Sequence, residues 1–496
     1  MNNQRPTQFE QAMTHLERRV NYENFQGMPY QELSGRLERL RELLVELGSP
    51  EKRFLTVHVA GTKGKGSACT LLKSILRQAG YRVGFFSSPH LYSLLERFAI
   101  DGESCDAEEF GELMLWLRDR VKNREKSWKF TYFELTTLFA FEYFARKKVD
   151  VAVLEVGLGG RWDATNVCSP TVTVITNISF DHIEQLGPTL GAIAEEKAGI
   201  IKPGIPVVAG PEGEEARQVI QRTAKNVGAP YFFLDEDFSI ASEEPEPAFR
   251  FFPLAMQGTL FREVDSLLLK LHGNHQRNNA ALAIAAAQLL ENHLKVSDSA
   301  IRSGLAAAFL PVRIELFRPL PDSPTFVVDG AHNRASIVAL VQTLKSLRPF
   351  RKKYLVFGTS LGKDCEGMLS ELLPFFDHVV LTQHSSNPRR FPPQGLLTIL
   401  SMLTRVPQSL RQLLPFPTPV DVDPAQGKDD DDDELGIDIV EHPFLALEKC
   451  WNMAKRDDLV CVCGSMYLAG ELRQFFIESI AVQVPGDRES VDTPRL

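Results

Sequence analysis

Short, nearly continuous apolar runs alternate with helix-length segments along most of the chain. Residues 54–60 (FLTVHVA) form a β-branched apolar run that ends at Gly61, and residues 68–79 (ACTLLKSILRQA) then carry a helical pattern. The order is therefore strand, glycine loop, helix. Further strands are predicted at residues 149–158, 171–178 and 205–210. Apolar runs without a polar face are typical of parallel strands that are covered on both sides, so the pattern predicts an α/β fold.

A second alternating series follows a proline-containing stretch in the last third of the chain. An Ala-rich helix is predicted at residues 279–290, and the prolines of residues 310–324 predict a linker. We place a domain boundary near residue 312, giving domains 1–312 and 313–496. The strands predicted beyond it are TFVVDGA (325–331), KYLVFGT (353–359), HVVLTQH (378–384) and DLVCVCGSM (458–466).

Length and charge narrow the class of protein. A chain of 496 residues exceeds what one hydrophobic core usually serves, which favours two domains. The net charge of -9 argues against a nucleic-acid-binding surface. The N-terminal segment lacks an apolar core, and no apolar run is long enough to cross a membrane, so we expect a cytoplasmic protein with small-molecule partners and no membrane contact.

The cysteines and the charged segments are interpreted as structural. Seven cysteines are scattered through apolar stretches, which favours buried, reduced thiols, and Cys461 and Cys463 are expected on one face of a buried strand. No cysteine or histidine pairs have zinc spacing. Residues 242–249 and the acidic run 428–436 are predicted to be solvated loops, although the acidic run has the alternative of binding divalent ions. The tail after Val484 is predicted to be disordered.

The strongest local motif is the glycine loop Gly61-Thr-Lys-Gly-Lys-Gly-Ser67, which lies between a predicted strand and a predicted helix. Backbone N–H groups of such a loop surround phosphate oxygens, while the helix N-terminus and Lys65 add favourable charge. The spacing differs from the usual phosphate-loop motif, because the first glycine is one residue too close and a glycine follows the lysine. The alternative is a glycine-rich turn capped by Ser67.

Two later strands end in residues suited to a metal. Glu155 lies near the end of the strand at 149–158, and His182 follows the strand at 171–178. Open α/β sheets bind ligands at the carboxyl ends of their strands, so Glu155 is a candidate ligand for magnesium and His182 for the same ion. The alternatives are a solvent-facing glutamate and a hydrogen-bonded core histidine. From the pattern alone, Lys197 is an ordinary surface lysine on a helix.

Asp329 and His332 form a similar cluster after the strand at 325–331. Taken alone the cluster is ambiguous, because Asp329 also qualifies as the N-terminal cap of the predicted helix at residues 334–347.

Taken together, the motifs resemble those of the folylpolyglutamate synthase and dihydrofolate synthase family, a branch of the Mur-ligase-like ATP-dependent amide ligases. The resemblance runs from about residue 15 to residue 475. The motifs that carry it are GTKGKGS (61–67), SSPHL (87–91), ERFAIDG (96–102), FELTT (133–137), VLEVGLGGRWDATN (153–166), NISFDHIEQLG (177–187), EEKAGIIK (195–202), GNHQRNNA (273–280), DGAHN (329–333) and GSMYLAGELR (464–473).

The resemblance implies an ATPase domain of the P-loop type with a mostly parallel sheet, followed by a smaller Rossmann-like glutamate-ligase domain. It also implies an ATP-dependent acid–amino-acid ligase that adds L-glutamate to dihydropteroate or to the γ-carboxylate of reduced folates through an acyl phosphate, releasing ADP and phosphate. The implied partners are ATP, L-glutamate and dihydropteroate or a reduced folate, and the implied state is a monomer.

Site residues follow from the same resemblance. Lys65, Glu155, His182 and Lys197 are implied to be catalytic, and Ser88, Glu155 and His182 to bind Mg²⁺. Lys197 matches a family lysine that is carbamylated beside a second metal. The implied ATP-binding residues are Thr62, Lys63, Gly64, Lys65, Gly66, Ser67, Asn279, Arg313, Asp329 and His332. The implied folate-binding residues are Thr131, Tyr132, Phe133, Glu134, Trp162, Asp163 and Ala164.

Two departures and two rival functions stand beside this prediction. The family loop usually has asparagine where this chain has Lys63, whose charge either tightens nucleotide binding or points outward without effect. The usual Pro-Gly-Arg is Pro311-Val312-Arg313 here. The rivals are a Mur-type peptide ligase of cell-wall synthesis and a non-catalytic nucleotide-binding relative. The segments SSPHL, FELTT and DGAHN favour folate over the first, and the joint presence of Lys65, Glu155, His182 and Lys197 argues against the second.

Overall fold

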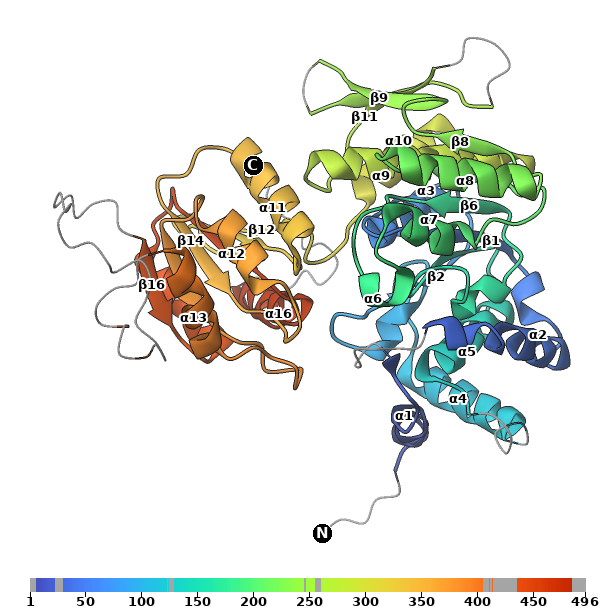
Figure 1. Cartoon of the computed structure of the whole chain (residues 1–496), viewed down its shortest axis with the longest axis horizontal. Coiled ribbons are helices and arrows are strands. Elements are labelled where there is room, and N and C mark those ends of the chain that lie inside the picture. The colour runs from blue at the N-terminus through green and yellow to red at the C-terminus, as the bar shows by residue number, and fades with distance from the viewer. Residues whose placement is uncertain are drawn as a thin grey trace. The chain divides into compact units, whose positions relative to one another are not determined.

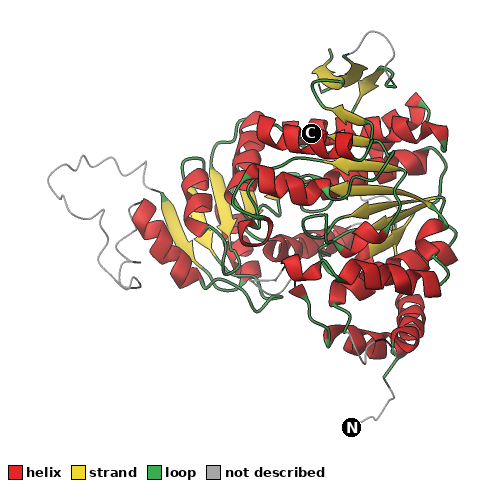
Figure 2. Cartoon of the chain, turned by 45° about the vertical axis from the view of Figure 1, so that its right-hand side comes forward, coloured by secondary structure: helices red, strands yellow, loops and turns green. Residues whose placement is uncertain are grey.

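The protein is described from a computed structural model, and it divides into two compact units. Unit 1 comprises residues 1–270 and 275–310, and unit 2 comprises residues 271–274 and 311–496. In both units strands alternate with covering helices (Figures 1 and 2). The structure describes residues 6–22, 30–122, 124, 129–244, 247–254, 260–404, 410, 413 and 435–483.

Unit 1 is built on an eight-stranded sheet with the order β4-β3-β2-β5-β1-β6-β7-β8. Six of these strands are parallel to their neighbours, in the sheet order β2-β5-β1-β6-β7-β8. Strands β3 and β4 are antiparallel additions at the β2 edge. The parallel strands are buried on both faces, as their continuous apolar sequences predict. The strands are β1 Leu55–Ala60, β2 Val83–Phe86, β3 Phe98–Ile100, β4 Glu103–Ser104, β5 Val151–Glu155, β6 Val172–Ile175, β7 Val207–Ala209 and β8 Tyr231–Phe233.

Helices cover both faces of this sheet. Apolar side chains of α5 pack on β2 and β5 in a core rich in phenylalanine, and those of α7 and α8 pack on β6 and β7. Helix α3 packs against β1, β2 and β5 and also contacts α10. The helices are α1 Gln8–Glu17, α2 Arg36–Glu46, α3 Lys65–Gln78, α4 Ala107–Val121, α5 Tyr132–Arg146, α6 Ile183–Leu186, α7 Leu190–Ala198, α8 Glu214–Asn226, α9 Asn274–Leu289 and α10 Asp298–Ala307, with short 3-10 turns at Tyr30–Leu33, Pro50–Lys52, Leu94–Arg97, Ala164–Val167 and Leu290–Asn292.

A small antiparallel sheet follows β8 (Figure 1). Its strands are β9 Phe238–Ser242, β10 Phe249–Pro253 and β11 Val264–Leu267, in the order β11-β10-β9. The rings of Phe238 on β9, Phe251 on β10 and Phe261 pack together in tilted and edge-to-face contacts. The end residues of the predicted loop at 242–249, Ser242 and Phe249, belong to the antiparallel strands β9 and β10, and residues 245 and 246 lie outside the described residues.

Unit 2 contains a six-stranded sheet with the order β12-β13-β17-β14-β15-β16, parallel except for β12. Helices α11, α12 and α13 pack on one face of the sheet. On the other face, the ring of Phe326 from β13 packs with those of Trp451 from α15 and Phe476 from α16. The elements are β12 Glu315–Phe317, β13 Thr325–Val328, α11 Arg334–Ser346, β14 Lys353–Phe357, α12 Cys365–Leu372, β15 His378–Leu381, α13 Pro393–Leu403, β16 Gly436–Ile439, α15 Pro443–Met453, β17 Leu459–Cys463 and α16 Met466–Gln483.

The predicted fold class is confirmed, with local differences. Each predicted strand is present but shorter. Strand β1 lacks only its first predicted residue, Phe54, whereas the last predicted residues of the others lie beyond the strand ends. The Ala-rich helix begins earlier, at Asn274, and the stretch predicted as a linker contains β12. All seven cysteines are free and buried, as predicted. The acidic run at 428–434 and the tail after Val484 lie outside the described residues. Among the helices that the structure describes, none is long and apolar enough to span a membrane.

Candidate active site

The topology of unit 1 brings three strand ends together. Strand β1 pairs with β5 on one side and with β6 on the other, and all three run parallel. The chain leaves β1 toward β2 at one side of the sheet and continues from β6 toward β7 at the other side. Ligands of open α/β sheets bind at the carboxyl end of such a switch point. The predicted phosphate loop, Glu155 and the segment from Asn177 to His182 all follow these strand ends.

The glycines of the phosphate loop are required because neighbouring side chains leave no room for a Cβ atom. A Cβ atom at Gly61 would lie 1.8 Å from the Thr176 hydroxyl oxygen, and one at Gly64 would lie 2.4 Å from Asn279 Oδ1. Gly64, at a φ of 81°, is the N-terminal cap of α3, and no side chain caps this helix. The alternative of a turn capped by Ser67 is therefore wrong, since Ser67 is buried within the helix. The loop instead leaves the helix N-terminus available for an anion.

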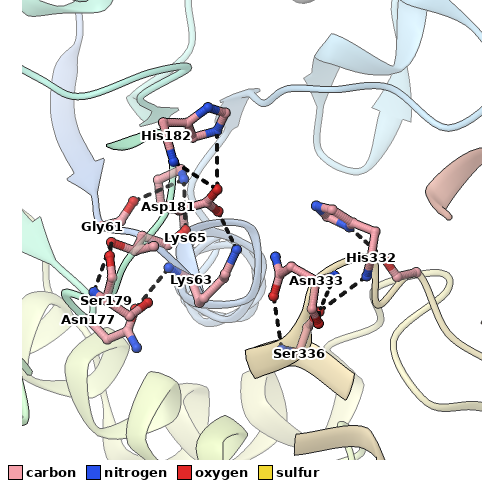
Figure 3. Close-up of polar contacts among 12 residues, drawn as sticks. Gly61, Lys63, Lys65, Asn177, Ser179, Asp181, His182, His332, Asn333 and Ser336 are labelled. Carbon is pink, nitrogen blue, oxygen red and sulfur yellow. Dashed lines mark hydrogen bonds and ion pairs between the residues drawn. The ribbon is translucent and has the colours of Figure 1, made fainter. Parts of the chain in front are cut away.

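Hydrogen bonds join this loop to the segment that follows β6 (Figure 3). The Thr62 N–H donates to the Asn177 carbonyl oxygen at 2.8 Å, and the Lys63 N–H donates to Asn177 Oδ1 at 2.9 Å. The Thr62 hydroxyl donates to the Ser179 carbonyl oxygen at 3.1 Å and accepts from the Ser179 N–H at 3.1 Å. The shape of the loop is thus set by protein contacts before any nucleotide binds.

Two lysines converge on one carbonyl oxygen of the loop. Lys65 Nζ and Lys197 Nζ each donate to the Gly61 carbonyl oxygen at 3.0 Å. Lys197 is buried, with 4% of its surface exposed, so its interpretation as a surface residue is wrong. Burial, followed by the charge of Lys65, lowers the pKa of Lys197 well below its usual value of 10.5. The buried amine is therefore held toward its neutral, nucleophilic form.

Glu155 ends β5 next to the phosphate loop. It is 6% exposed, which excludes the alternative of a solvent-facing glutamate. A Cβ atom on Gly66, in the first turn of α3, would lie 3.8 Å from both carboxylate oxygens of Glu155. A carboxylate at this position, together with the half-buried hydroxyl residue Ser88 after β2, provides the oxygen ligands that Mg²⁺ prefers.

His182 lies at the surface of the site. Its side chain is 53% exposed and its backbone φ is 50°, so the core-histidine alternative is wrong. Its ring Nε2 lies 3.9 Å from Asp181 Oδ1. Among the described residues, no group of three His, Cys, Asp or Glu side chains is placed to bind a metal. Mg²⁺ commonly obtains most of its ligands from water and nucleotide oxygens, so joint binding of the ion by Glu155, Ser88 and His182 stays a prediction.

Some of the residues predicted to bind the acceptor are buried and have structural contacts, whereas others are partly exposed. Thr131 caps α5 and forms a reciprocal capping pair with Glu134, whose carboxylate also pairs with Arg36 at 2.5 Å. Tyr132 is buried as well. Phe133 is half-buried, and its ring lies where a Cβ atom on Gly157 would meet it at 2.6 Å. Among Thr131, Tyr132, Phe133 and Glu134, it is Phe133 whose ring is partly exposed and could contact a ligand.

The turn after β5 is organised by Asp163. Its carboxylate accepts from the Leu158 N–H at 3.0 Å and from the Thr165 N–H at 3.0 Å, and it is 5% exposed. Ala164 is buried in the 3-10 turn that follows. Trp162 is half-buried. Asp163 shapes the turn that carries Trp162. Contact of these residues with an acceptor stays a prediction.

The cluster that follows β13 in unit 2 also contains a residue with a structural role, Asp329. Asp329 accepts from the Ile314 N–H at 2.8 Å and from the Ala331 N–H at 2.7 Å. The cap of α11 is Asn333, so the alternative in which Asp329 caps this helix is wrong. His332 Nδ1 lies 2.9 Å from the Gly330 carbonyl oxygen, so Nδ1 carries the proton and donates it (Figure 3). Arg313 Nη1 contacts Met466 Sδ at 3.2 Å.

Comparison with known protein families gives two adjacent matches. Residues 59–287 match the Mur ligase middle domain, and residues 312–466 match the Mur ligase, glutamate ligase domain. The chain is 40% identical over 341 residues to the dihydrofolate synthase/folylpolyglutamate synthase of Bacillus subtilis, covering 68% of this chain and 78% of the relative. The enzyme of the same name from Escherichia coli is 35% identical over 354 residues, which is 69% of this chain and 76% of the relative.

The chain belongs to the folylpolyglutamate synthase and dihydrofolate synthase family. Solved structures agree. Escherichia coli FolC in complex with DHPP and ADP superposes with a TM-score of 0.77 at 28% identity, covering 95% of this chain and 99% of that one. Folylpolyglutamate synthase from Thermotoga maritima superposes with a TM-score of 0.75 at 29% identity, covering 95% and 96%. As a member of this family, the protein is an ATP-dependent ligase.

Lys63, the departure from the family loop, forms an ion pair with Asp181. The lysine side chain is 28% exposed and the aspartate 26%, so the ammonium points toward the strand-end cluster and not into solvent. The pair adds a charged contact to the hydrogen bonds that already join the phosphate loop to the segment after β6. Lys63 therefore adds a positive charge to the phosphate loop and also holds Asp181, the residue that precedes His182, in place.

We expect Lys63→Asn, which restores the family residue, to raise the KM for ATP by about three- to tenfold while kcat changes by less than about threefold. A partly exposed ion pair of this kind contributes about 1 kcal/mol or less, and the lost charge affects nucleotide binding more than the chemical step. Steady-state ADP release at varied ATP measures both constants. Lys147→Asn, which breaks the ion pair with Glu109 on α4, is the matched control. A loss of kcat of about a hundredfold would instead assign Lys63 to the chemistry.

Sequence reasoning missed two groups at this site. Arg36 pairs with Glu134 from almost a hundred residues away, and Tyr30 places its hydroxyl against the turn that carries Trp162. Both belong to the N-terminal segment, where no motif marks them. Their partners are distant in the chain, so no local pattern reveals them.

Proposed function

We propose that this ligase joins L-glutamate to the carboxyl group of a pteroate-type acceptor, either dihydropteroate or the γ-carboxylate of a reduced folate, at the expense of ATP. The observation that carries the proposal is the constellation at the carboxyl edge of the unit 1 sheet. It comprises a glycine loop at a helix N-terminus, the amines of half-buried Lys65 and buried Lys197 on the Gly61 carbonyl oxygen, and the carboxylate of Glu155. Relatives of the same family are named for both activities.

The chemistry proceeds in two steps. An oxygen of the acceptor carboxylate forms a bond to the γ-phosphorus of ATP, the bond to the bridging oxygen breaks, and ADP leaves. The amine of glutamate then attacks the acyl carbon, the carbon–oxygen bond to phosphate breaks, and the nitrogen loses a proton as the amide forms. Lys65 and the N–H groups of the loop stabilise the negative charge on the transferred phosphoryl group.

We assign Ser88, Glu155 and His182 to a bound Mg²⁺, which would neutralise charge on the nucleotide phosphates. We further assign a carbamate to Lys197: its neutral nitrogen adds to CO2, a nitrogen–carbon bond forms, and one proton is released. The product carries a negative charge beside Lys65, where a cation was disfavoured. This reverses an unfavourable contact between like charges.

The nucleotide is assigned to the loop from Thr62 to Ser67 and, by family resemblance, to four further residues. Asn279 lies beside Gly64 in the same unit, where a Cβ atom on that glycine would meet its side chain. Arg313, Asp329 and His332 belong to unit 2, and their contact with ATP stays a prediction.

The test is steady-state ADP release by the full chain with dihydropteroate or tetrahydrofolate as acceptor, each with and without L-glutamate. We expect ADP release to require both acceptor and glutamate, with one glutamylated product formed per ADP. Activity with dihydropteroate identifies a dihydrofolate synthase, activity with tetrahydrofolate a folylpolyglutamate synthase, and activity with both a bifunctional enzyme. Absence of glutamate-dependent product with either acceptor would contradict the proposal.

A further inference from the structure

The hydroxyl of Tyr30 lies at a junction between three functional segments of unit 1. The residue is 3% exposed and belongs to the apolar cluster that includes Ile193, Ala198 and Ile200 around α7. Its hydroxyl oxygen accepts from the Gly160 N–H at 3.2 Å and from the Trp162 N–H at 3.4 Å. A single phenol thus holds two backbone groups of the turn that carries the predicted acceptor-binding residues.

The turn is built around this phenol. A Cβ atom on Gly159 would lie 2.1 Å from the Tyr30 hydroxyl oxygen, so only glycine allows the backbone to approach so closely. Burial, followed by the charge of the Glu196 carboxylate, raises the pKa of the Tyr30 phenol, and Glu196 directly precedes Lys197 on α7. The phenol therefore contacts the acceptor turn on one side and helix α7 on the other.

The turn itself rests on the last turn of α7. The Arg161 N–H donates to the Glu196 carbonyl oxygen at 2.8 Å. A Cβ atom on Gly160 would meet the carbonyl oxygens of Glu196 at 2.9 Å and of Lys197 at 3.0 Å. Lys197 in turn donates to the Gly61 carbonyl oxygen of the phosphate loop at 3.0 Å. A continuous series of direct contacts thus runs from the acceptor turn, past Tyr30 and α7, to the phosphate loop.

We propose that Tyr30 is a positioning residue of the ligase, whose hydroxyl sets the placement of the acceptor turn relative to the phosphate loop and so directs the acceptor carboxylate at the γ-phosphate. The inference rests on the proposed function. In-line attack requires the reacting atoms to be placed within a few tenths of an ångström, and small displacements lower the rate steeply. Water then competes for the activated phosphoryl group or the acyl phosphate.

The test compares Tyr30→Phe with the wild-type chain. The substitution keeps the ring that fills the core and removes the oxygen alone. We expect kcat/KM for the acceptor to fall by about tenfold or more, because the turn loses its shared hydrogen-bond acceptor. We also expect the ratio of ADP released to glutamylated product to rise above one, whereas ADP affinity and the thermal unfolding temperature stay close to the wild-type values.

Tyr81→Phe is the matched control, since the Tyr81 hydroxyl donates to the Lys295 carbonyl oxygen at 3.2 Å far from the turn in the chain. An unchanged acceptor kcat/KM and an unchanged ratio in Tyr30→Phe would overturn the inference. Equal losses of acceptor turnover and ADP affinity would overturn it too, since a general structural role predicts them. Failure of the wild-type chain to use either acceptor would instead contradict the proposed function, so the two failures are distinguishable.

Discussion

Glu155→Gln is expected to lower glutamate-dependent ADP release on the order of a thousandfold or more and to raise the Mg²⁺ concentration that the residual activity requires. The substitution preserves shape and replaces a charged oxygen ligand with a neutral amide. Glu155 is buried beside the first turn of α3. ADP release at varied Mg²⁺ measures the effect, and thermal unfolding checks that the fold is kept.

Glu142→Gln provides a matched control. Glu142 is also 6% exposed, but it lies on α5 and pairs with Arg146 at 2.8 Å. Its loss should cost stability and leave the Mg²⁺ requirement unchanged. Near-normal turnover of Glu155→Gln with a normal Mg²⁺ requirement would show that the metal assignment is wrong.

Lys197→Ala is expected to reduce turnover to a similar extent, and the wild-type enzyme is expected to lose activity in buffer freed of CO2 and to regain it when bicarbonate is added. The reason is the depressed pKa of Lys197: burial and Lys65 favour the neutral amine, which is the form that reacts with CO2. The neutral fraction decreases as pH falls through this lowered pKa. In limiting bicarbonate, activity should therefore decline on the acidic side.

A carbamate has direct signatures. A carbon-13 resonance from labelled bicarbonate should appear in the wild-type chain and be absent from Lys197→Ala. Lys73→Met is the control, because burial lowers the pKa of Lys73 to about 8 as well, yet its amine lies over the Phe85 ring. If wild-type activity does not respond to CO2 removal and no carbamate resonance appears, Lys197 acts as a plain amine and the carbamate assignment fails.

Sequence predicted the sheet and the loop because both depend on local chemistry. Uninterrupted apolar runs indicate buried parallel strands, and a glycine loop between a strand and a helix predicts a phosphate site. The strand ends of Glu155 and His182 were placed by the same rule. The antiparallel strands β9 to β11 were not predicted, since their short alternating segments lie among charged residues that are typical of loops.

The burial of Lys197 illustrates what the pattern does not contain. A lysine on a short helix with little amphipathic character gives no signal of burial, and only the packing of α7 against the acceptor turn and the phosphate loop encloses it. Asp163 is a second case: the resemblance implied only a ligand contact, and the hydrogen bonds that its carboxylate accepts from the N–H groups of Leu158 and Thr165 were not predicted. Tertiary contacts of this kind are set by residues distant in the chain.

The backbone around Arg313 has a consequence for how this arginine meets a ligand. Val312 has a φ of 52° and Ile314 a φ of 49°, and branched side chains occupy this region only when the surrounding structure enforces it. Both side chains are buried, so the packed interior dictates the direction of the intervening guanidinium. An anion that binds Arg313 would therefore contact a guanidinium whose direction is already set, and binding would cost little side-chain conformational entropy.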